Sequence, residues 1–91
     1  MLTKGTLEIL QTANEKEPKS FKDFMTISVD GKKISSATVS KRLDELLKAN
    51  AIEMVIIRSK SGRRRIMHRT TEKGRRVIRT ALELKKILVF L

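Results

Sequence analysis

The chain has 91 residues, a formal net charge of +11 and no cysteine. Its length corresponds to one domain with a modest core, for which a hydrophobic fraction of 40% is sufficient. The lack of cysteine excludes disulfides, thiolate zinc sites and a cysteine nucleophile. No apolar run approaches the ~18 residues of a membrane span, and residues 1–11 lack the apolar core of a signal peptide. We therefore expect a soluble, cytoplasmic protein with no membrane partner.

The positive charge is concentrated in one segment. Residues 58–79 contain ten lysine and arginine residues and a single acidic residue, Glu72. A concentrated positive field attracts polyanions, so nucleic acid is the expected partner. The alternative is that these basic residues form a solvent-exposed surface that binds no polyanion.

The first part of the chain is predicted to form two helices. Residues 3–14 have apolar side chains at helical spacing, and Thr3 can serve as the N-cap. Ser20 can cap a short second helix that begins at the next residue. Phe21 and Phe24 share one face of that helix, and we expect both to be core anchors.

A longer amphipathic helix follows a short connection. Residues 26–34 are predicted to be a loop or a small hairpin with its turn at Asp30 and Gly31. Residues 35–50 are predicted to be a helix with Ser35 as its N-cap. Four apolar side chains fall on one arc of this helix and form the expected buried stripe: Val39, Leu43, Leu46 and Leu47.

The periodicity then changes from helical to extended. Residues 52–58 and 65–70 are predicted to be the strands of a hairpin, with the turn at Ser61 and Gly62 and the highest density of arginine at its tip. Thr71 is expected to cap a last helix, which runs into the apolar C-terminal end of the chain.

The string ISSATVSKRLDELLKANAIE, with TTEKG after the hairpin, resembles winged helix-turn-helix transcriptional regulators of the MarR, HxlR and PadR kind. The resemblance spans roughly residues 6–79 and implies an α+β, mostly helical fold with a two-stranded basic wing and a long C-terminal helix. The segment over residues 26–34 contains more residues than the corresponding segment of these regulators usually does. No small-molecule effector is evident, since neither a ligand-binding domain nor a sensor cysteine is recognised, so the effector control of these regulators is not carried over to this chain. The matching residues are Ile34, Ser35, Thr38, Val39, Ser40, Arg42, Leu43, Leu46, Ala51, Ile52, Thr71 and Gly74.

This resemblance implies a mode of DNA binding. The helix over residues 35–50 would enter the major groove with its N-terminal end at the base edges, and the wing over residues 58–65 would contact the backbone or the minor groove. The residues themselves support this without the resemblance, because small and hydroxyl side chains at the start of that helix would let it come close to a duplex. The candidate DNA-binding residues are Ser36, Ala37, Thr38, Ser40, Lys41, Arg42, Lys60, Arg63, Arg64 and Arg65. Strand alternation would place Arg63 and Arg65 on one face and Arg64 on the other.

The C-terminal helix is predicted to form a homodimer. Residues 1–79 would be the winged helix domain, and residues 80–91 the dimerisation segment. Ile78 and Leu82 lie on a different arc and are expected to pack on their own domain. The residues of the predicted dimer seam are spaced alternately four and three positions apart, as in a pair of packed helices. They are Val77, Ala81, Leu84, Leu88 and Leu91. The alternative is that the tail folds back onto its own core.

Enzyme activity is not predicted. The only histidine, His68, is expected to be packed or at a strand edge, and no phosphate loop, carboxylate pair or metal-ligand spacing implies a cofactor. The predicted function is sequence-preferring binding of double-stranded DNA by a transcriptional regulator. Two alternatives remain, an RNA- or ribosome-associated winged helix and a protein-protein module that binds an acidic partner. The low content of aromatic residues weighs against recognition of single strands.

Overall fold

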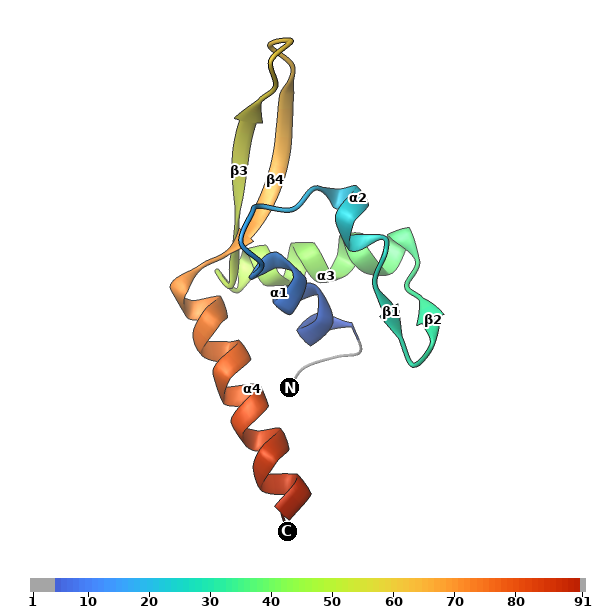
Figure 1. Ribbon diagram of the computed structural model, residues 1–91, viewed down its shortest axis with the longest axis vertical. Coiled ribbons are helices and arrows are strands. Elements are labelled where there is room, and N and C mark those ends of the chain that lie inside the picture. Colours follow the sequence, from blue (N-terminus) through green and yellow to red (C-terminus); the bar gives the residue numbers. More distant parts are fainter. Residues whose placement is uncertain (1–4, 91) are drawn as a thin grey trace.

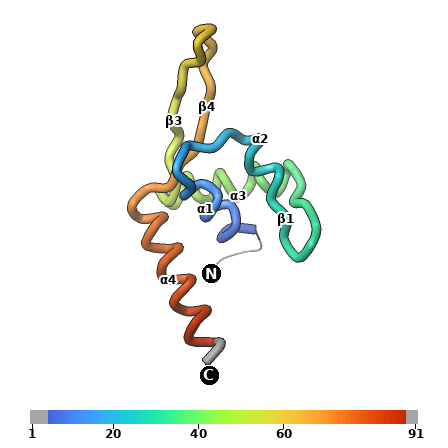
Figure 2. The backbone as a smooth tube through the Cα atoms, viewed as in Figure 1, coloured from blue at the N-terminus to red at the C-terminus, as the bar shows by residue number. Residues whose placement is uncertain are grey.

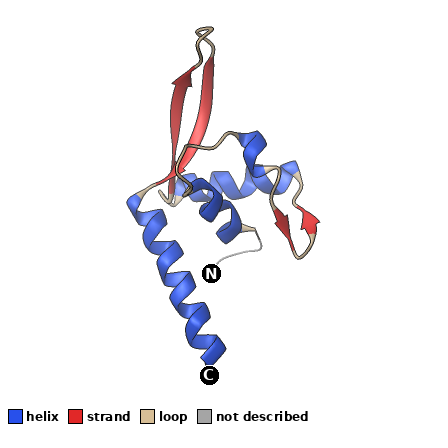
Figure 3. Ribbon diagram, in the orientation of Figure 1, coloured by secondary structure: helices blue, strands red, loops and turns tan. Residues whose placement is uncertain are grey.

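In the computed structural model, residues 5–90 are described, with side chains up to residue 88, and they form helices and two antiparallel hairpins (Figures 1 and 3). The β3–β4 hairpin and α4 extend in opposite directions from a small helical body, so the molecule measures 54 × 28 × 22 Å. In chain order the elements are α1 (Thr6–Ala13), α2 (Phe21–Phe24), β1 (Ser28–Val29), β2 (Lys32–Lys33), α3 (Ser36–Lys48), β3 (Ile52–Arg58), β4 (Arg64–Thr70) and α4 (Glu72–Phe90).

Serine caps determine where α2 and α3 begin. The Ser20 hydroxyl accepts a hydrogen bond from the Asp23 amide at 3.3 Å, and the Ser20 amide donates to the Asp23 carboxylate at 2.8 Å. The backbone amide of Ser20, and then its side chain, hold the pKa of Asp23 below its usual value. The Ser35 hydroxyl accepts from the Thr38 amide at 3.1 Å. Both predicted caps are therefore confirmed.

The start of α1 differs from the prediction. The helix begins at Thr6, and its N-cap is Gly5, which has a φ of 87° and provides no side-chain cap. Glycine reaches this left-handed conformation without the steric cost that other residues carry. Thr3, the predicted cap, lies outside the described residues. At the other end Asn14 caps the helix, and its amide donates to the Leu10 carbonyl at 3.1 Å.

The core lies where α1, α3 and the bases of β3 and α4 meet, and α1 lies against α3 below the hairpin (Figure 2). Phe24 is fully buried, but Phe21 is 39% exposed, so the prediction that both anchor the core was wrong for Phe21. Because α2 is a single turn at the edge of the core, Phe24 occupies the inner position and Phe21 stays at the rim. The buried cluster is Ile9, Leu10, Ala13, Phe24, Val39, Leu43, Leu46, Ala51, Ile52 and Ile78.

Two hairpins follow the predicted turn signals. β1 pairs with β2 across Asp30 and Gly31, whose φ angles are 54° and 79°, as a tight hairpin turn requires. β3 pairs with β4 over its whole length, from Ile52 opposite Thr70 to Arg58 opposite Arg64. This register determines which side chains share a face of the hairpin.

A third segment of the chain pairs with β4, and this pairing was not predicted from the sequence. Lys19 forms an isolated antiparallel bridge with His68, in which each amide donates to the other residue's carbonyl at 2.7 Å. This bridge attaches the segment that precedes α2 to the edge of β4. It therefore joins the helical body to the base of the hairpin.

Thr71 connects the end of α3 to the start of α4. Its hydroxyl donates to the Asn50 carbonyl at 2.6 Å and accepts from the Gly74 amide at 3.1 Å, so the predicted cap of α4 is confirmed. Asn50 has a φ of 60°, which ends α3 in the left-handed geometry that asparagine tolerates.

The C-terminal part of α4 leaves the body of the protein (Figure 1). Ile78 is buried in the core as predicted, but Leu82 is exposed, so its predicted packing on the domain was wrong. The reason is that α4 has separated from the body by that turn. Leu84 and Leu88 are also exposed, by 56% and 64%. The alternative in which the tail folds back onto its own core is therefore contradicted as far as residue 88.

Candidate nucleic-acid interface

The N-terminal half of α3 presents small and polar side chains to solvent. Ser36, Ala37, Ser40 and Lys41 are all exposed, because the apolar stripe of this helix is turned into the core. Among the residues that the structure describes, Lys41 has no ion-pair or hydrogen-bond partner. A surface of this kind lets a helix approach a polyanion closely and offers it one unpaired positive charge.

Thr38 and Arg42 are less accessible than their neighbours. The Thr38 hydroxyl accepts a hydrogen bond from the Ser35 hydroxyl at 3.0 Å and is partly buried. The Arg42 side chain is only 16% exposed and forms an ion pair with Glu45 one turn later. Both side chains are thus engaged within the helix. The Thr38 hydroxyl still has its own proton to donate.

The β1–β2 hairpin adds two lysines that were not among the predicted site residues. Lys32 and Lys33 are exposed, and together with Ser35 and Thr38 they line a depression of about 300 Å³ at the start of α3. The Lys-Lys pair after the predicted turn was the available signal. It brings further positive charge to the end of α3 that carries the small side chains.

The tip of the β3–β4 hairpin carries unpaired positive charge. Lys60, Arg63, Arg64 and Arg65 are all exposed, and no described acidic residue pairs with them. Arg58 lies directly opposite Arg64 across the two strands. Like charges in this position repel each other, so binding of an anion there would be favourable.

The turn that carries Arg63 has a defined geometry. The Ser59 amide donates to the Arg63 carbonyl at 2.9 Å, and the Ser59 hydroxyl accepts from the Arg63 amide at 3.2 Å. Gly62 has a φ of 82°, as expected for the predicted turn. Because β4 begins at Arg64, Arg63 belongs to the turn. The predicted alternation therefore holds for Arg64 and Arg65 within β4, and the placement of Arg63 on the face of Arg65 stays a prediction.

The base of the hairpin contains an ion pair between its strands, unlike its tip. Arg69 donates to the Glu53 carboxylate across the strands at 2.7 Å. Further along the chain, Arg75 donates to the Thr70 carbonyl at 3.4 Å. One positive charge at the base is therefore balanced by a carboxylate, whereas no described carboxylate pairs with the charges at the tip.

His68 is a packing residue at the base of the hairpin. It is buried, and its ring meets the ring of Phe24 edge to face with 6.0 Å between the centroids. Burial lowers the pKa of His68 below its usual value, and Nδ1 has no hydrogen-bond partner among the described residues. The described residues contain no group of three or more side chains suited to hold a metal ion. No described helix is both long and apolar enough to cross a bilayer.

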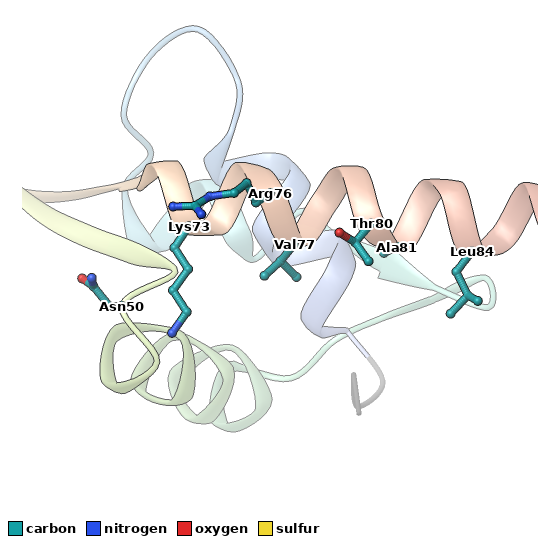
Figure 4. A pocket seen from close by; sticks show the side chains of 7 residues that line it. All are labelled: Asn50, Lys73, Arg76, Val77, Thr80, Ala81 and Leu84. Carbon is teal, nitrogen blue, oxygen red and sulfur yellow. The ribbon is translucent and has the colours of Figure 1, made fainter.

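An open groove of about 810 Å³ lies beside α4 (Figure 4). Val77, Ala81 and Leu84, three residues of the predicted dimer seam, line it from one side of the helix. Lys73 and Arg76 lie at one end, next to Asn50. Leu88 continues the same arc beyond the groove, and Leu91 lies outside the described residues.

Comparison with known proteins shows a likeness in structure. No protein-family model and no curated protein sequence matches this chain. A solved structure described as a Streptococcus transcriptional regulator superimposes with a TM-score of 0.67 and 17% sequence identity. The match covers 92% of this chain and 83% of that one. The two proteins share a fold.

Proposed function

We propose that this protein is a cytoplasmic transcriptional regulator that binds double-stranded DNA with a sequence preference, through a winged helix-turn-helix. In this proposal α2 and α3 form the helix-turn-helix and the β3–β4 hairpin is the wing. The observation that carries the proposal is the unpaired arginine cluster at the hairpin tip, on a fold shared with a transcriptional regulator. Residues 1–79 would be the DNA-binding domain, with no enzymatic activity.

In the proposed complex, α3 lies in the major groove as the recognition helix. Ser36, Ala37, Ser40 and Lys41 would face base edges and phosphates, since their side chains are accessible. Thr38 would donate to a phosphate from its place in the cap, and Arg42 would have to exchange its ion pair with Glu45 for a DNA contact. We therefore infer that Lys41 contributes more to binding than Arg42.

The wing supplies most of the electrostatic attraction in this proposal. Lys60, Arg63, Arg64 and Arg65 would contact the backbone or an adjacent minor groove, where a narrow groove favours arginine. Only one phenylalanine with a described side chain, Phe21, is exposed, so few aromatic surfaces are offered to unstacked bases. This supports duplex DNA over single-stranded RNA.

We further propose that the protein is a homodimer held together by residues 80–91 with the preceding turn of α4. The seam residues Val77, Ala81, Leu84, Leu88 and Leu91 would meet the same residues of a second copy. The support is the groove along Val77, Ala81 and Leu84, with exposed Leu88 beyond it. Such a dimer would place two copies of α3 on one duplex about one helical turn (~34 Å) apart, which implies a pseudo-palindromic site.

A competition experiment tests the proposed function. Purified protein bound to a labelled duplex is challenged with unlabelled duplex DNA, structured RNA or an acidic protein at equal charge concentration. Duplex DNA should displace the label most effectively, and one DNA sequence more effectively than a scrambled one. Stronger competition by RNA or by the acidic protein would instead support an RNA-associated winged helix or a protein-protein module.

A further inference from the structure

One face of the β3–β4 hairpin carries an unusual strip of exposed apolar side chains. Met54, Ile56 and Ile66 are 58%, 56% and 59% exposed. Ile56 lies directly opposite Ile66, and Met54 lies two residues before Ile56 on the same strand, so all three share a face. We call these three residues the hairpin strip.

The apolar side chains on the opposite face of the same hairpin are less exposed. There the Glu53–Arg69 ion pair lies at the base, the half-buried Val55 and Met67 lie opposite each other in the middle, and Ile57 lies opposite Arg65 nearer the tip. Ile57 is less exposed than Ile56, its neighbour in the chain. Both faces of the hairpin are therefore apolar along the middle, and the side chains of the hairpin strip are the more exposed.

The hairpin strip has the core at one end and arginine at the other. Towards the base, the residue opposite Met54 is His68, which is buried against Phe24. Towards the tip, Arg58 and Arg64 follow on the same face, directly opposite each other. The strip is thus an extension of the core-facing side of the sheet beyond the body, and it ends in two positive charges.

The positive charge around the hairpin strip favours an anionic partner, and the apolar side chains of the strip favour a partner that also offers apolar surface. No acidic residue occurs between Glu53 and Glu72. A DNA minor groove has phosphates along both rims and partly apolar walls of sugars, while the base edges on its floor present hydrogen-bond donors and acceptors. Hairpins of two strands enter DNA grooves, and exposed apolar side chains of minor-groove proteins insert at base steps and bend the duplex. The hairpin extends freely from the body, as groove entry requires (Figure 1).

We propose that the hairpin strip is a DNA contact that enters the minor groove and bends the duplex. This inference rests on the proposed DNA-binding function and extends it from charge attraction to the shape of the DNA. Ile56 and Ile66 lie against sugars and the faces of bases at an opened step, while Arg58 and Arg64 reach the phosphates on the rims. Binding therefore favours sites with flexible TA or CA/TG steps under the hairpin, since these steps are the easiest to kink.

Neighbouring isoleucines on opposite faces provide a matched test. Ile56→Thr removes apolar surface from the strip, and Ile57→Thr makes the same chemical change on the other face of the same strand. Threonine keeps the β-branched side chain that strands favour, so both variants retain the hairpin. Ile66→Thr repeats the test from the partner strand. The full-length proteins are bound to a doubly fluorophore-labelled duplex of about 30 base pairs, and affinity and end-to-end energy transfer are measured.

The expected result is a bent duplex with the wild-type protein and with Ile57→Thr. Ile56→Thr and Ile66→Thr should each bind about tenfold more weakly, equivalent to ~1.4 kcal/mol, and bend the duplex less. Equal affinity and bending for Ile56→Thr and Ile57→Thr would overturn the strip's role while leaving DNA binding intact. A change in self-association without a change in DNA binding would assign the strip to a protein interface and also overturn it. Absence of any duplex binding by wild type would overturn the proposed function and this inference together.

Discussion

Gly74 lies so close to Ala51 that a β-carbon on Gly74 would stand 2.0 Å from the Ala51 carbonyl oxygen. The same carbonyl accepts a hydrogen bond from the Thr71 amide at 3.0 Å. The first turn of α4 is therefore fixed against the backbone of the segment between α3 and β3. Because α3 and the hairpin diverge from this segment, the contact helps to set the position of both candidate DNA-binding elements.

Gly74→Ala should destabilise the protein. Alanine favours a helix by about 1 kcal/mol over glycine, but its methyl group would displace α4 from a backbone carbonyl, which cannot move aside as a flexible side chain can. We expect a net loss of about 1–3 kcal/mol in the free energy of unfolding, measured by urea denaturation. Arg79→Ala, at an exposed position of the same helix, serves as control and should change stability by less than about 0.5 kcal/mol. A Gly74→Ala protein as stable as wild type would contradict this packing.

Substitutions on the two sides of α3 should separate stability from DNA recognition. Leu43→Ala empties a core position and should cost ~2–5 kcal/mol of unfolding free energy. A Thr38→Ala/Lys41→Ala double variant should retain most of its stability and lose sequence preference, measured by selection of binding sites from a random pool. An unaltered sequence profile for this double variant would remove α3 as the recognition helix.

The stability of the protein should decrease in mild acid because of His68. Burial lowers the pKa of His68 below its usual value of 6.5, so the unfolded chain binds this proton more readily than the folded protein does. The unfolding free energy should therefore be constant at higher pH and should fall as the pH drops through 6.5 towards the lower pKa of the folded state. His68 is the only histidine, so few other groups titrate in this window.

Urea denaturation between about pH 8 and pH 5 measures this effect. His68→Gln should lose the pH dependence in this range, because glutamine does not titrate. Equal stability of the wild-type protein across the range would show that protonation of His68 is not coupled to unfolding. The lowered pKa of Asp23 acts in the same direction but at more acidic pH, where carboxylates titrate.

Charge on the α4 seam should dissociate the proposed dimer. Leu84→Glu/Leu88→Glu would place carboxylates where two copies are proposed to meet, so sedimentation at tens of micromolar should show a monomer. Leu82→Glu is the matched control, since Leu82 is exposed on a different arc of the same helix. The same shift for the control, or a monomeric wild-type protein, would rule out this seam.

The elements of this fold were predictable where a local signal determined them. Ser20, Ser35 and Thr71 all cap helices as their sequence context indicates, and Asp30–Gly31 forms the predicted turn. These features depend on hydrogen bonds and backbone preferences over a few residues. They need no knowledge of the tertiary structure.

The errors arose where burial depends on the relative position of distant elements. Phe21 and Leu82 both lie on apolar patterns, yet both are exposed, because α2 ends after one turn and α4 leaves the body. The bridge between Lys19 and His68 joins residues far apart in the chain, and no local pattern encodes it. Similarly, Lys32 and Lys33 became part of the candidate site only once β2 was placed beside the start of α3.

The salt dependence of duplex binding tests the central claim most directly. If a wild-type dimer neutralises about six phosphates, the logarithm of its affinity should fall with the logarithm of salt concentration at a slope near −5. Arg63→Ala/Arg64→Ala/Arg65→Ala should weaken binding to all sequences and flatten the slope by about one unit for each phosphate that the protein no longer neutralises. The charge-matched control Arg79→Ala/Lys85→Ala/Lys86→Ala removes as many positive charges from α4 and should keep a slope close to that of wild type. Equal slopes and affinities for the hairpin variant and wild type would contradict the proposal that the hairpin is a DNA-binding wing.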